Sequence, residues 1–235
     1  MINLTQLSVI VPTRNEVHNI GRLLATLPAA VRLIVVDASE DETARRVRQL
    51  RPHGTTILRN TANVTVARQA GAEAARTPWL LFTDADVVFA SDYFERLTQR
   101  SAASALYGPK LSSTEFNQYY DWFARGQAWA HRLGIPAVSG SNLLVHQETF
   151  WAIGGFDLSL TCNEDSELGW RWKRRGFRIE FDPTLKVFAH DHRRLRRGAT
   201  AKTAHTFLRC FLLYCNLLPR AWRAHDWGYW KPIKE

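Results

Sequence analysis

The feature that most constrains this chain is the alternation, over its first hundred residues, of short apolar runs with segments of helical spacing. Residues 7–11 form a β-branched apolar run that ends at Pro12. Residues 33–36 and 79–82 form two more such runs, and residues 56–58 form a weaker one. Runs of this length and composition are typical of buried strands.

The segments between these runs have the periodicity of helices. Asp41 and Thr43 are residue types that begin helices. Gly71 belongs to a helix face made of small residues, which permits close packing of the helix on a sheet. The faces comprise Val17, Ile20, Leu23, Leu24 and Leu27; Ala44, Val47 and Leu50; and Val64, Ala67, Gly71, Ala74 and Ala75. Strands and helices in alternation predict an α/β fold, with a mostly parallel sheet and helices on both of its faces.

The pattern changes after Gly108-Pro109. A long helical segment at residues 115–133 is rich in aromatic side chains, which we interpret as core more than as a sugar platform. We expect further helices at 147–153 and 164–175, and strands at 137–145, 177–181 and 185–190.

These elements predict one domain over residues 1–198, followed by a tail at 199–235. The donor half covers about 1–108 and the acceptor half about 109–198.

The net charge of +9 is concentrated in the last third of the chain. Such a surface attracts nucleotide phosphates, anionic lipids or nucleic acid, and charge alone leaves the three open. Residues 199–218 lack the ~20 uninterrupted apolar residues of a membrane span, because Lys202, His205 and Arg209 interrupt them. We expect an amphipathic helix that packs on the body or lies on a membrane.

The three scattered cysteines and an N-terminus without the features of a signal peptide indicate a cytoplasmic protein. With the amphipathic tail, the predicted location extends to the inner membrane face as a peripheral protein.

Acidic residues follow several of the predicted strands. Asp37 closes the second strand, Asp84 and Asp86 close the fourth, and Glu16 follows the first. Each alone would fit a helix cap or a solvated loop. Because ligands bind beyond the carboxyl ends of parallel strands, together they predict one binding crevice.

The Asp84-Ala85-Asp86 stretch suits a hard divalent cation. Mg²⁺ or Mn²⁺ takes oxygen ligands and commonly bridges a carboxylate to a diphosphate. Such an ion would make the diphosphate a better leaving group.

A second acidic cluster, Glu164-Asp165-Ser166-Glu167, lies at a predicted helix start. An acidic first turn that interacts with the helix dipole explains it equally well. Transfer to a hydroxyl, however, requires a base, and a carboxylate on a rigid helix end is suited to that role.

These motifs together resemble the inverting glycosyltransferases of family 2, which have the GT-A fold. The resemblance spans roughly residues 7–190 and is quite specific when all four motifs occur in order. They are Val9-Ile10-Val11-Pro12-Thr13-Arg14-Asn15-Glu16; Val35-Val36-Asp37-Ala38-Ser39 with Asp41 and Thr43; Thr83-Asp84-Ala85-Asp86; and Gly154-Gly155-Phe156-Asp157 with Glu164-Asp165.

The resemblance implies a role for individual residues. The residues implied to line the nucleotide pocket are Pro12, Arg14, Glu16, Asp37, Asp41, Arg68 and Asp84. Asp37 would bind the base, which favours a UDP-sugar, and Asp84 the ribose or sugar. Asp86 would hold the metal and Asp165 would be the general base, with Glu164 beside it. His190 matches a position that reaches the metal in some relatives, although a structural histidine is at least as good an interpretation.

The implied reaction is one displacement at the anomeric carbon, onto an acceptor hydroxyl that belongs to a lipid-linked molecule if the tail binds a membrane. Arg193, Arg194, Arg196 and Arg197 are expected in a loop that either closes over the diphosphate or faces solvent or lipid. The chain lacks the Q-x-x-R-W motif of processive synthases, since Leu168 precedes Arg171-Trp172. A single addition is therefore expected.

Two other classes of function remain open. A sugar-nucleotide nucleotidyltransferase shares the architecture, but it usually has a glycine-rich loop after the first strand, and residues 11–16 contain no glycine. A non-enzymatic basic protein that binds membrane or nucleic acid explains the charge but not the acids at the strand ends; nucleic acid is the less favoured partner.

Overall fold

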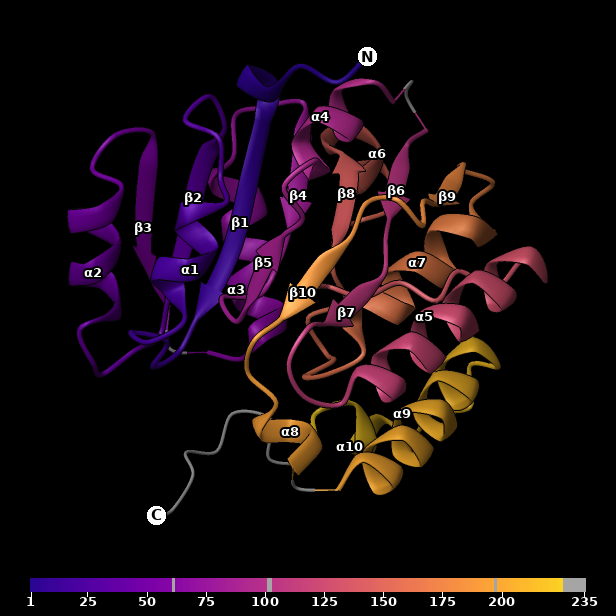
Figure 1. Ribbon diagram of the computed structural model, residues 1–235. Helices are drawn as coiled ribbons and strands as arrows, with labels where there is room; N and C mark the ends of the chain where they lie inside the picture. Colours follow the sequence, from indigo (N-terminus) through magenta and orange to yellow (C-terminus); the bar gives the residue numbers. More distant parts are fainter. Residues whose placement is uncertain (61, 101–102, 197, 226–235) are drawn as a thin grey trace.

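The computed structural model describes residues 1–60, 62–100, 103–196 and 198–225. A seven-stranded sheet runs through its centre in the order β3-β2-β1-β4-β8-β6-β9 (Figure 1). The strands of this sheet are β1 (Leu7–Thr13), β2 (Arg32–Asp37), β3 (Thr55–Arg59), β4 (Trp79–Phe82), β6 (Ala105–Tyr107), β8 (Leu143–His146) and β9 (Ile179–Phe181).

The first four strands confirm the predicted parallel sheet. β1 pairs in parallel with β2 on one side and β4 on the other, with Thr13 opposite Asp37 and Ile10 opposite Phe82. β3 extends the sheet in parallel beyond β2. The carboxyl ends of β2, β1 and β4 therefore lie at one edge, as the acidic residues predicted.

The other half of the sheet differs from the prediction. β8 is antiparallel to both β4 and β6, and it begins only at Leu143. The expected strand at 137–145 was therefore too long. Ser139 to Asn142 forms a turn, in which the Asn142 N–H donates to the Ser139 carbonyl, 3.0 Å away. The Asn142 side chain donates in turn to the Leu185 carbonyl at 2.7 Å, so the segment is held by polar contacts instead of ladder pairing.

A second sheet of three short strands was only partly predicted. It consists of β5 (Val87–Phe89), β10 (Val187–Ala189) and β7 (Lys110–Ser112), in the order β5-β10-β7. β10 lies within the expected strand at 185–190, whereas β5 and β7 have only three residues each and show little periodicity. This sheet brings the end of β10 beside the residues that follow β4, because the His190 N–H donates to the Asp86 carbonyl at 2.9 Å.

Helices cover both faces of the large sheet. Alternate residues of β1 point to opposite faces: Val9 lies in one hydrophobic cluster and Ile10 in the other. Gly71 permits close packing, since a Cβ there would lie 2.4 Å from the Ile10 side chain. The helices of more than four residues are α1 (Ile20–Ala25), α2 (Thr43–Leu50), α3 (Val64–Ala74), α4 (Tyr93–Thr98), α5 (Asn117–Arg132), α6 (Gln147–Ala152), α7 (Glu164–Arg174) and α9 (Ala199–Tyr214).

The shorter helices are the 3-10 turn Leu4–Gln6, α8 (Arg193–Arg196) and α10 (Arg220–Arg223). α1, α2 and α4 share one hydrophobic cluster, and α3, α6 and α7 share the other. α5, α8, α9 and α10 lie together at one end of the molecule (Figure 1).

The aromatic helix α5 corrects the interpretation of its side chains as core. Tyr120 is buried, but Trp122 is 53% and Trp129 is 65% exposed. α5 rests on the small sheet and on β9 through one face only, which leaves these tryptophans on the outside.

Candidate functional site

Asp84 stands at the end of β4 and binds groups from three other elements. Its Oδ1 accepts from the Arg68 guanidinium at 2.6 Å, and its Oδ2 accepts from the Ser141 hydroxyl at 2.5 Å. The Lys110 ammonium lies 3.6 Å from the same Oδ2. Asp84 is thus held rigidly at the carboxyl edge of the sheet.

Asp86, two residues later, has an oxygen without such support. Its Oδ1 is buried and accepts no hydrogen bond, with the Lys110 ammonium 3.5 Å away. A buried carboxylate oxygen without a hydrogen bond is costly unless a cation binds it. This atom fits the divalent cation that the sequence motif implies.

Lys110 was not predicted as a site residue. It is the first residue of β7, and its ammonium lies within 3.6 Å of both Asp84 and Asp86. Its only sequence signal is its position directly after the Gly108-Pro109 break. Pairing between β7 and β10 brings it to the acidic edge.

Arg68 connects the donor side to the acceptor side. It is 5% exposed on α3, and one guanidinium nitrogen binds Asp84 while the other pairs closely with Glu164 at the start of α7. Burial raises the pKa of Glu164, and the Arg68 charge opposes that rise. Arg68 and Glu164 therefore form the buried base of the site.

Asp165, the predicted base, is more accessible than Glu164. Its Oδ2 accepts from the Gly140 N–H at 2.6 Å and its Oδ1 from the Ser166 N–H at 2.7 Å. Position 140 must be glycine for this arrangement, since a Cβ there would lie 2.5 Å from the Arg68 guanidinium carbon. One short segment, 139–142, thus orients both Asp84 and Asp165.

Glu16 and His190 lie beside Asp86. Burial raises the pKa of Glu16, with Asn19 and Arg193 opposing and the nearby Asp86 charge adding to the rise. Burial also lowers the pKa of His190, as does Arg22, whereas Asp86 opposes this. A neutral imidazole is the form that binds metals.

Over the described residues, no three His, Cys, Asp or Glu side chains converge into a closed metal cage. A Mg²⁺ or Mn²⁺ ion with few protein ligands completes its shell with water and phosphate oxygens. Asp86, with His190 across from it, fits such an open site.

The predicted nucleotide-binding residues occupy the loops after β1 and β2. Pro12 is buried within β1, and Arg14 is partly buried in the loop that follows. Asp37 is 3% exposed and accepts from the Thr13 hydroxyl at 2.8 Å, while its other oxygen pairs with Arg59 at 2.9 Å.

Polar contacts connect these two loops. Asp41 accepts from the Val17 N–H at 3.3 Å, and the Glu16 N–H donates to the Thr43 hydroxyl at 2.9 Å. The two loops therefore form one edge above β1 and β2.

The expected basic loop is instead the short helix α8. Arg193 pairs with Glu16 at 2.8 Å and also with Asp191, and Arg196 pairs with Glu115. These ion pairs hold the segment in one place, which corrects the interpretation of an open loop. Arg197 and the Arg194 side chain lie outside the described residues.

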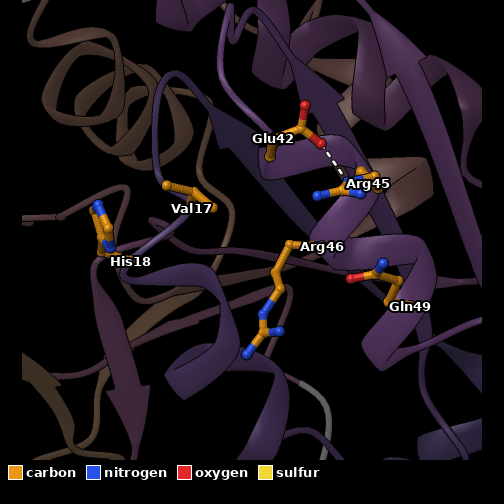
Figure 2. Close-up of a pocket in the computed structure, with 6 residues that line it drawn as sticks. All are labelled: Val17, His18, Glu42, Arg45, Arg46 and Gln49. Atoms are coloured by element: carbon orange, nitrogen blue, oxygen red, sulfur yellow. Dashed lines mark ion pairs between the residues drawn. The ribbon is translucent and has the colours of Figure 1, made fainter.

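A pocket of about 400 Å³ lies beside the nucleotide-binding loops. Figure 2 shows Val17 and His18 on one side of it and the residues of α2 on the other, with Glu42 paired to Arg45. None of the predicted site residues lines it. A second pocket, of about 320 Å³, lies between α7 and α9, with Trp170 and Tyr214 among its lining residues.

The sequence model of the glycosyl transferase family 2 matches residues 8–141, the stretch that holds the strand-end acids, Lys110 and Ser141. The chain belongs to glycosyl transferase family 2. Its relatives include the succinoglycan biosynthesis protein ExoA of Rhizobium meliloti, 27% identical over 77% of this chain. The pre-mycofactocin glycosyltransferase of Mycobacterium tuberculosis is 26% identical over 84% of this chain. The chain spans 62% and 45% of the lengths of these two proteins.

Solved structures confirm the GT-A fold of this family member. S. aureus TarS 1-349 in complex with UDP superposes with a TM-score of 0.64 at 16% identity, covering 92% of this chain and 68% of TarS 1-349. The mannosyltransferase PcManGT of Pyrobaculum calidifontis, in complex with GDP-Man and Mn²⁺, gives 0.62 at 20% identity, covering 93% of this chain and 72% of PcManGT.

Proposed function

We propose that this protein is an inverting glycosyltransferase that moves one sugar from a nucleotide diphosphate sugar to an acceptor hydroxyl. The observation that carries the proposal is the buried Arg68, which binds Asp84 on the donor side and Glu164 on the acceptor side. It holds Asp84, two residues before the proposed metal ligand Asp86, and Glu164, the neighbour of the proposed base Asp165. Family membership favours this activity over a nucleotidyltransferase or a non-enzymatic basic protein.

The donor would lie across the edge formed by the loops after β1, β2 and β4. Asp37 would bind the base, which favours uracil, once the exposed Arg59 yields one carboxylate oxygen. Pro12, Arg14 and Asp41 would border the nucleotide, and Asp84 the ribose or sugar. Arg68 would act behind Asp84, since its guanidinium is buried and paired.

Asp86 and His190 would hold Mn²⁺ or Mg²⁺, and the bound ion would neutralise the departing diphosphate. Lys110, whose ammonium lies 3.5 Å from Asp86, would add a second positive charge there. Charges positioned in advance stabilise the charge that develops as the bond breaks.

Asp165 would accept the proton of the attacking hydroxyl. Two N–H groups hold its carboxylate in one orientation, which supports this role. The single-displacement geometry then inverts the anomeric carbon. Glu164, buried against Arg68, positions the start of α7.

The acceptor half would include the pocket between α7 and α9. Trp170 stacks on Tyr214 with the ring centroids 4.7 Å apart, and Arg171 and Arg174 also line the pocket. Aromatic faces and arginines suit a sugar or phosphate-bearing acceptor. We also propose that this acceptor is lipid-linked and that the tail, described over residues 199–225, lies on the inner membrane face.

A thermal-shift panel of UDP, GDP, dTDP and CDP with Mn²⁺, Mg²⁺ or chelator tests the donor site. Stabilisation by one nucleotide that requires metal and disappears in Asp86→Ala is the expected result. Asp92→Ala, which removes an exposed acid that pairs with Arg96 four residues later, is the matched control. No stabilisation by any nucleotide with any metal would refute the proposed transferase.

A further inference from the structure

α9 presents its apolar side to solvent. Phe207 is 59%, Leu208 is 54% and Phe211 is 61% exposed. The spacing of these residues places them on one side of the helix. An amphipathic helix in a globular protein normally turns its large apolar side chains inward, whereas α9 leaves these three exposed in addition to the apolar residues that it buries.

The opposite side of α9 packs on the body through both apolar and polar groups, and Leu213 lies there in a small hydrophobic cluster with Leu160. Arg209 is 2% exposed, and its guanidinium donates to the carbonyls of Trp222 at 2.5 Å and Arg223 at 3.1 Å. The Asn163 side chain donates to the Cys210 sulfur at 3.6 Å. Rolling the helix to bury its phenylalanines would expose Leu213 and break these contacts, so the orientation is built in.

α5 continues the same apolar surface. The ring of Trp122 contacts that of Phe207 at a centroid distance of 6.3 Å, and the Tyr119 hydroxyl lies 3.2 Å from the Thr203 hydroxyl. Figure 1 shows the two helices side by side at one end of the molecule. Trp129 extends the surface along α5 and is 65% exposed.

We call this surface the α5–α9 face, and it holds most of the exposed large apolar side chains of the described residues. Its members are Trp122, Trp129, Leu133, Ile135, Phe207, Leu208, Phe211, Leu217 and Trp222. Exposed apolar side chains gathered on neighbouring elements mark an interaction site.

The charges around the α5–α9 face are basic. Arg125 and Arg132 are exposed on α5, and Arg220 is exposed on α10. The sequence of α5 contains one acid, Asp121, and residues 199–225 contain none. Tryptophan and arginine around an apolar stripe are typical of helices that lie in the headgroup region of a bilayer.

We propose that the α5–α9 face docks on an anionic lipid bilayer. Among the described residues, no helix has the length and hydropathy that a membrane span requires. Phe207, Phe211 and Trp122 enter the boundary of the acyl chains, and the arginines bind lipid phosphates.

This docking deepens the proposed function, because it delivers the acceptor to the base. α9 packs on α7, which begins with Glu164-Asp165. A hydroxyl carried by a lipid headgroup would therefore reach the site from the membrane side of the molecule. The inference rests on the proposed function for this step only.

Co-sedimentation with vesicles tests the docking. The probe is phosphatidylcholine vesicles with about one-third phosphatidylglycerol, compared with pure phosphatidylcholine. The wild-type chain is expected to sediment with the anionic vesicles, less so as ionic strength rises. Combining Phe207→Ser with Phe211→Ser should lower the partition coefficient on the order of tenfold or more.

The matched control combines Leu50→Ser with Trp151→Ser, which removes apolar surface from α2 and α6, far from the α5–α9 face in Figure 1. It should sediment like wild type, and circular dichroism should show both variants folded. Equal sedimentation of the two variants would overturn the proposal. So would a concentration-dependent dimer, abolished by the Phe207 and Phe211 changes, in a chain that ignores vesicles.

Vesicle binding is measured without donor, so it is independent of the transferase activity. Nucleotide-dependent thermal stabilisation of the Phe207 and Phe211 variant should equal that of wild type. If the variant loses vesicle binding but keeps this stabilisation, the change affects docking alone. If nucleotides do not stabilise the wild-type chain, the proposed transferase function is refuted, whatever the vesicle result.

Discussion

The acidic edge of the sheet and the α5–α9 face differ in which side chains they bury: the edge buries charged groups, whereas the face exposes apolar ones. At the edge, charged groups are buried: Arg68 pairs with Asp84 and Glu164, while Asp86 Oδ1 accepts no hydrogen bond and has the Lys110 ammonium 3.5 Å away. At the face, apolar side chains such as Phe211 remain in water although Arg209 of the same helix is buried.

This difference suggests a separate binding partner for each of the two surfaces. A buried carboxylate oxygen without a hydrogen bond is energetically unfavourable, and so is an exposed stripe of aromatic side chains. Each feature therefore suggests a binding partner. Asp86 Oδ1 indicates that a small cation binds at the edge. The α5–α9 face indicates that a partner with an extended apolar surface binds there. One protein therefore has two incomplete surfaces of different chemistry.

The largest expected effect concerns Asp165 at the edge. Asp165→Asn keeps an oxygen to accept from the Gly140 N–H but cannot take a proton, so the turnover rate should fall by about 10²–10⁴-fold. Nucleotide-dependent thermal stabilisation should remain. Measured rates within twofold of wild type would remove Asp165 from the role of base.

Removal of Arg68 should destabilise the fold. Arg68→Met leaves Glu164 buried without its cation, which should cost about 3–5 kcal/mol in a urea titration. Arg96→Met, which breaks an exposed pair with Asp92, is the matched control and should leave the free energy of unfolding nearly unchanged.

The same variant should show a particular pH dependence. Burial already raises the pKa of Glu164, and loss of Arg68 raises it further. A carboxyl whose pKa is higher in the folded than in the unfolded state stabilises the fold at low pH and loses this contribution as pH rises through the folded pKa. The stability deficit of Arg68→Met should therefore shrink as pH falls from 8 toward 5; a constant deficit would contradict a buried Glu164.

Lys110 provides a smaller effect at the edge. Lys110→Met should weaken binding of the nucleotide diphosphate roughly tenfold by isothermal titration, because the positive charge that we propose to face the diphosphate would be lost. Lys110→Arg should restore most of the affinity. The exposed Lys186, replaced by methionine, makes the same charge change away from the carboxylates and should leave affinity unchanged.

The smallest effect is expected at Phe211 on the α5–α9 face. The informative comparison is with Arg209, which lies on the opposite, buried side of the same helix. Phe211→Ser should change the free energy of unfolding by within about 0.5 kcal/mol, since the ring contacts water. Arg209→Met should cost about 1–3 kcal/mol, because two carbonyls lose their donor. The reverse order in a denaturant titration would show that α9 turns its phenylalanines inward.

Sequence alone predicted the donor half well, because its strands are continuous apolar runs. Residues 79–82 form β4 as expected, and Asp37 closes β2. Local periodicity suffices where neighbouring strands are parallel and buried on both faces.

The acceptor half was harder to predict, because its contacts join distant residues. Lys110 reaches the carboxylates only through a three-residue strand, and the turn at 139–142 was read as a strand. The aromatic residues of α5 were assigned to the core because periodicity identifies a stripe without saying which way it faces. Burial of Arg209, in particular, depends on carbonyls that follow it by more than ten residues.

The central claim is that a cation and a nucleotide diphosphate meet at Asp86. A crystal soaked with UDP and Mn²⁺, measured for anomalous scattering of manganese, tests it directly. The expected result is a single strong peak between the Asp86 carboxylate and the diphosphate, absent in Asp86→Asn crystals. Nucleotide bound instead in the pocket beside α2 in Figure 2, or bound at the edge with no manganese near Asp86, would contradict it.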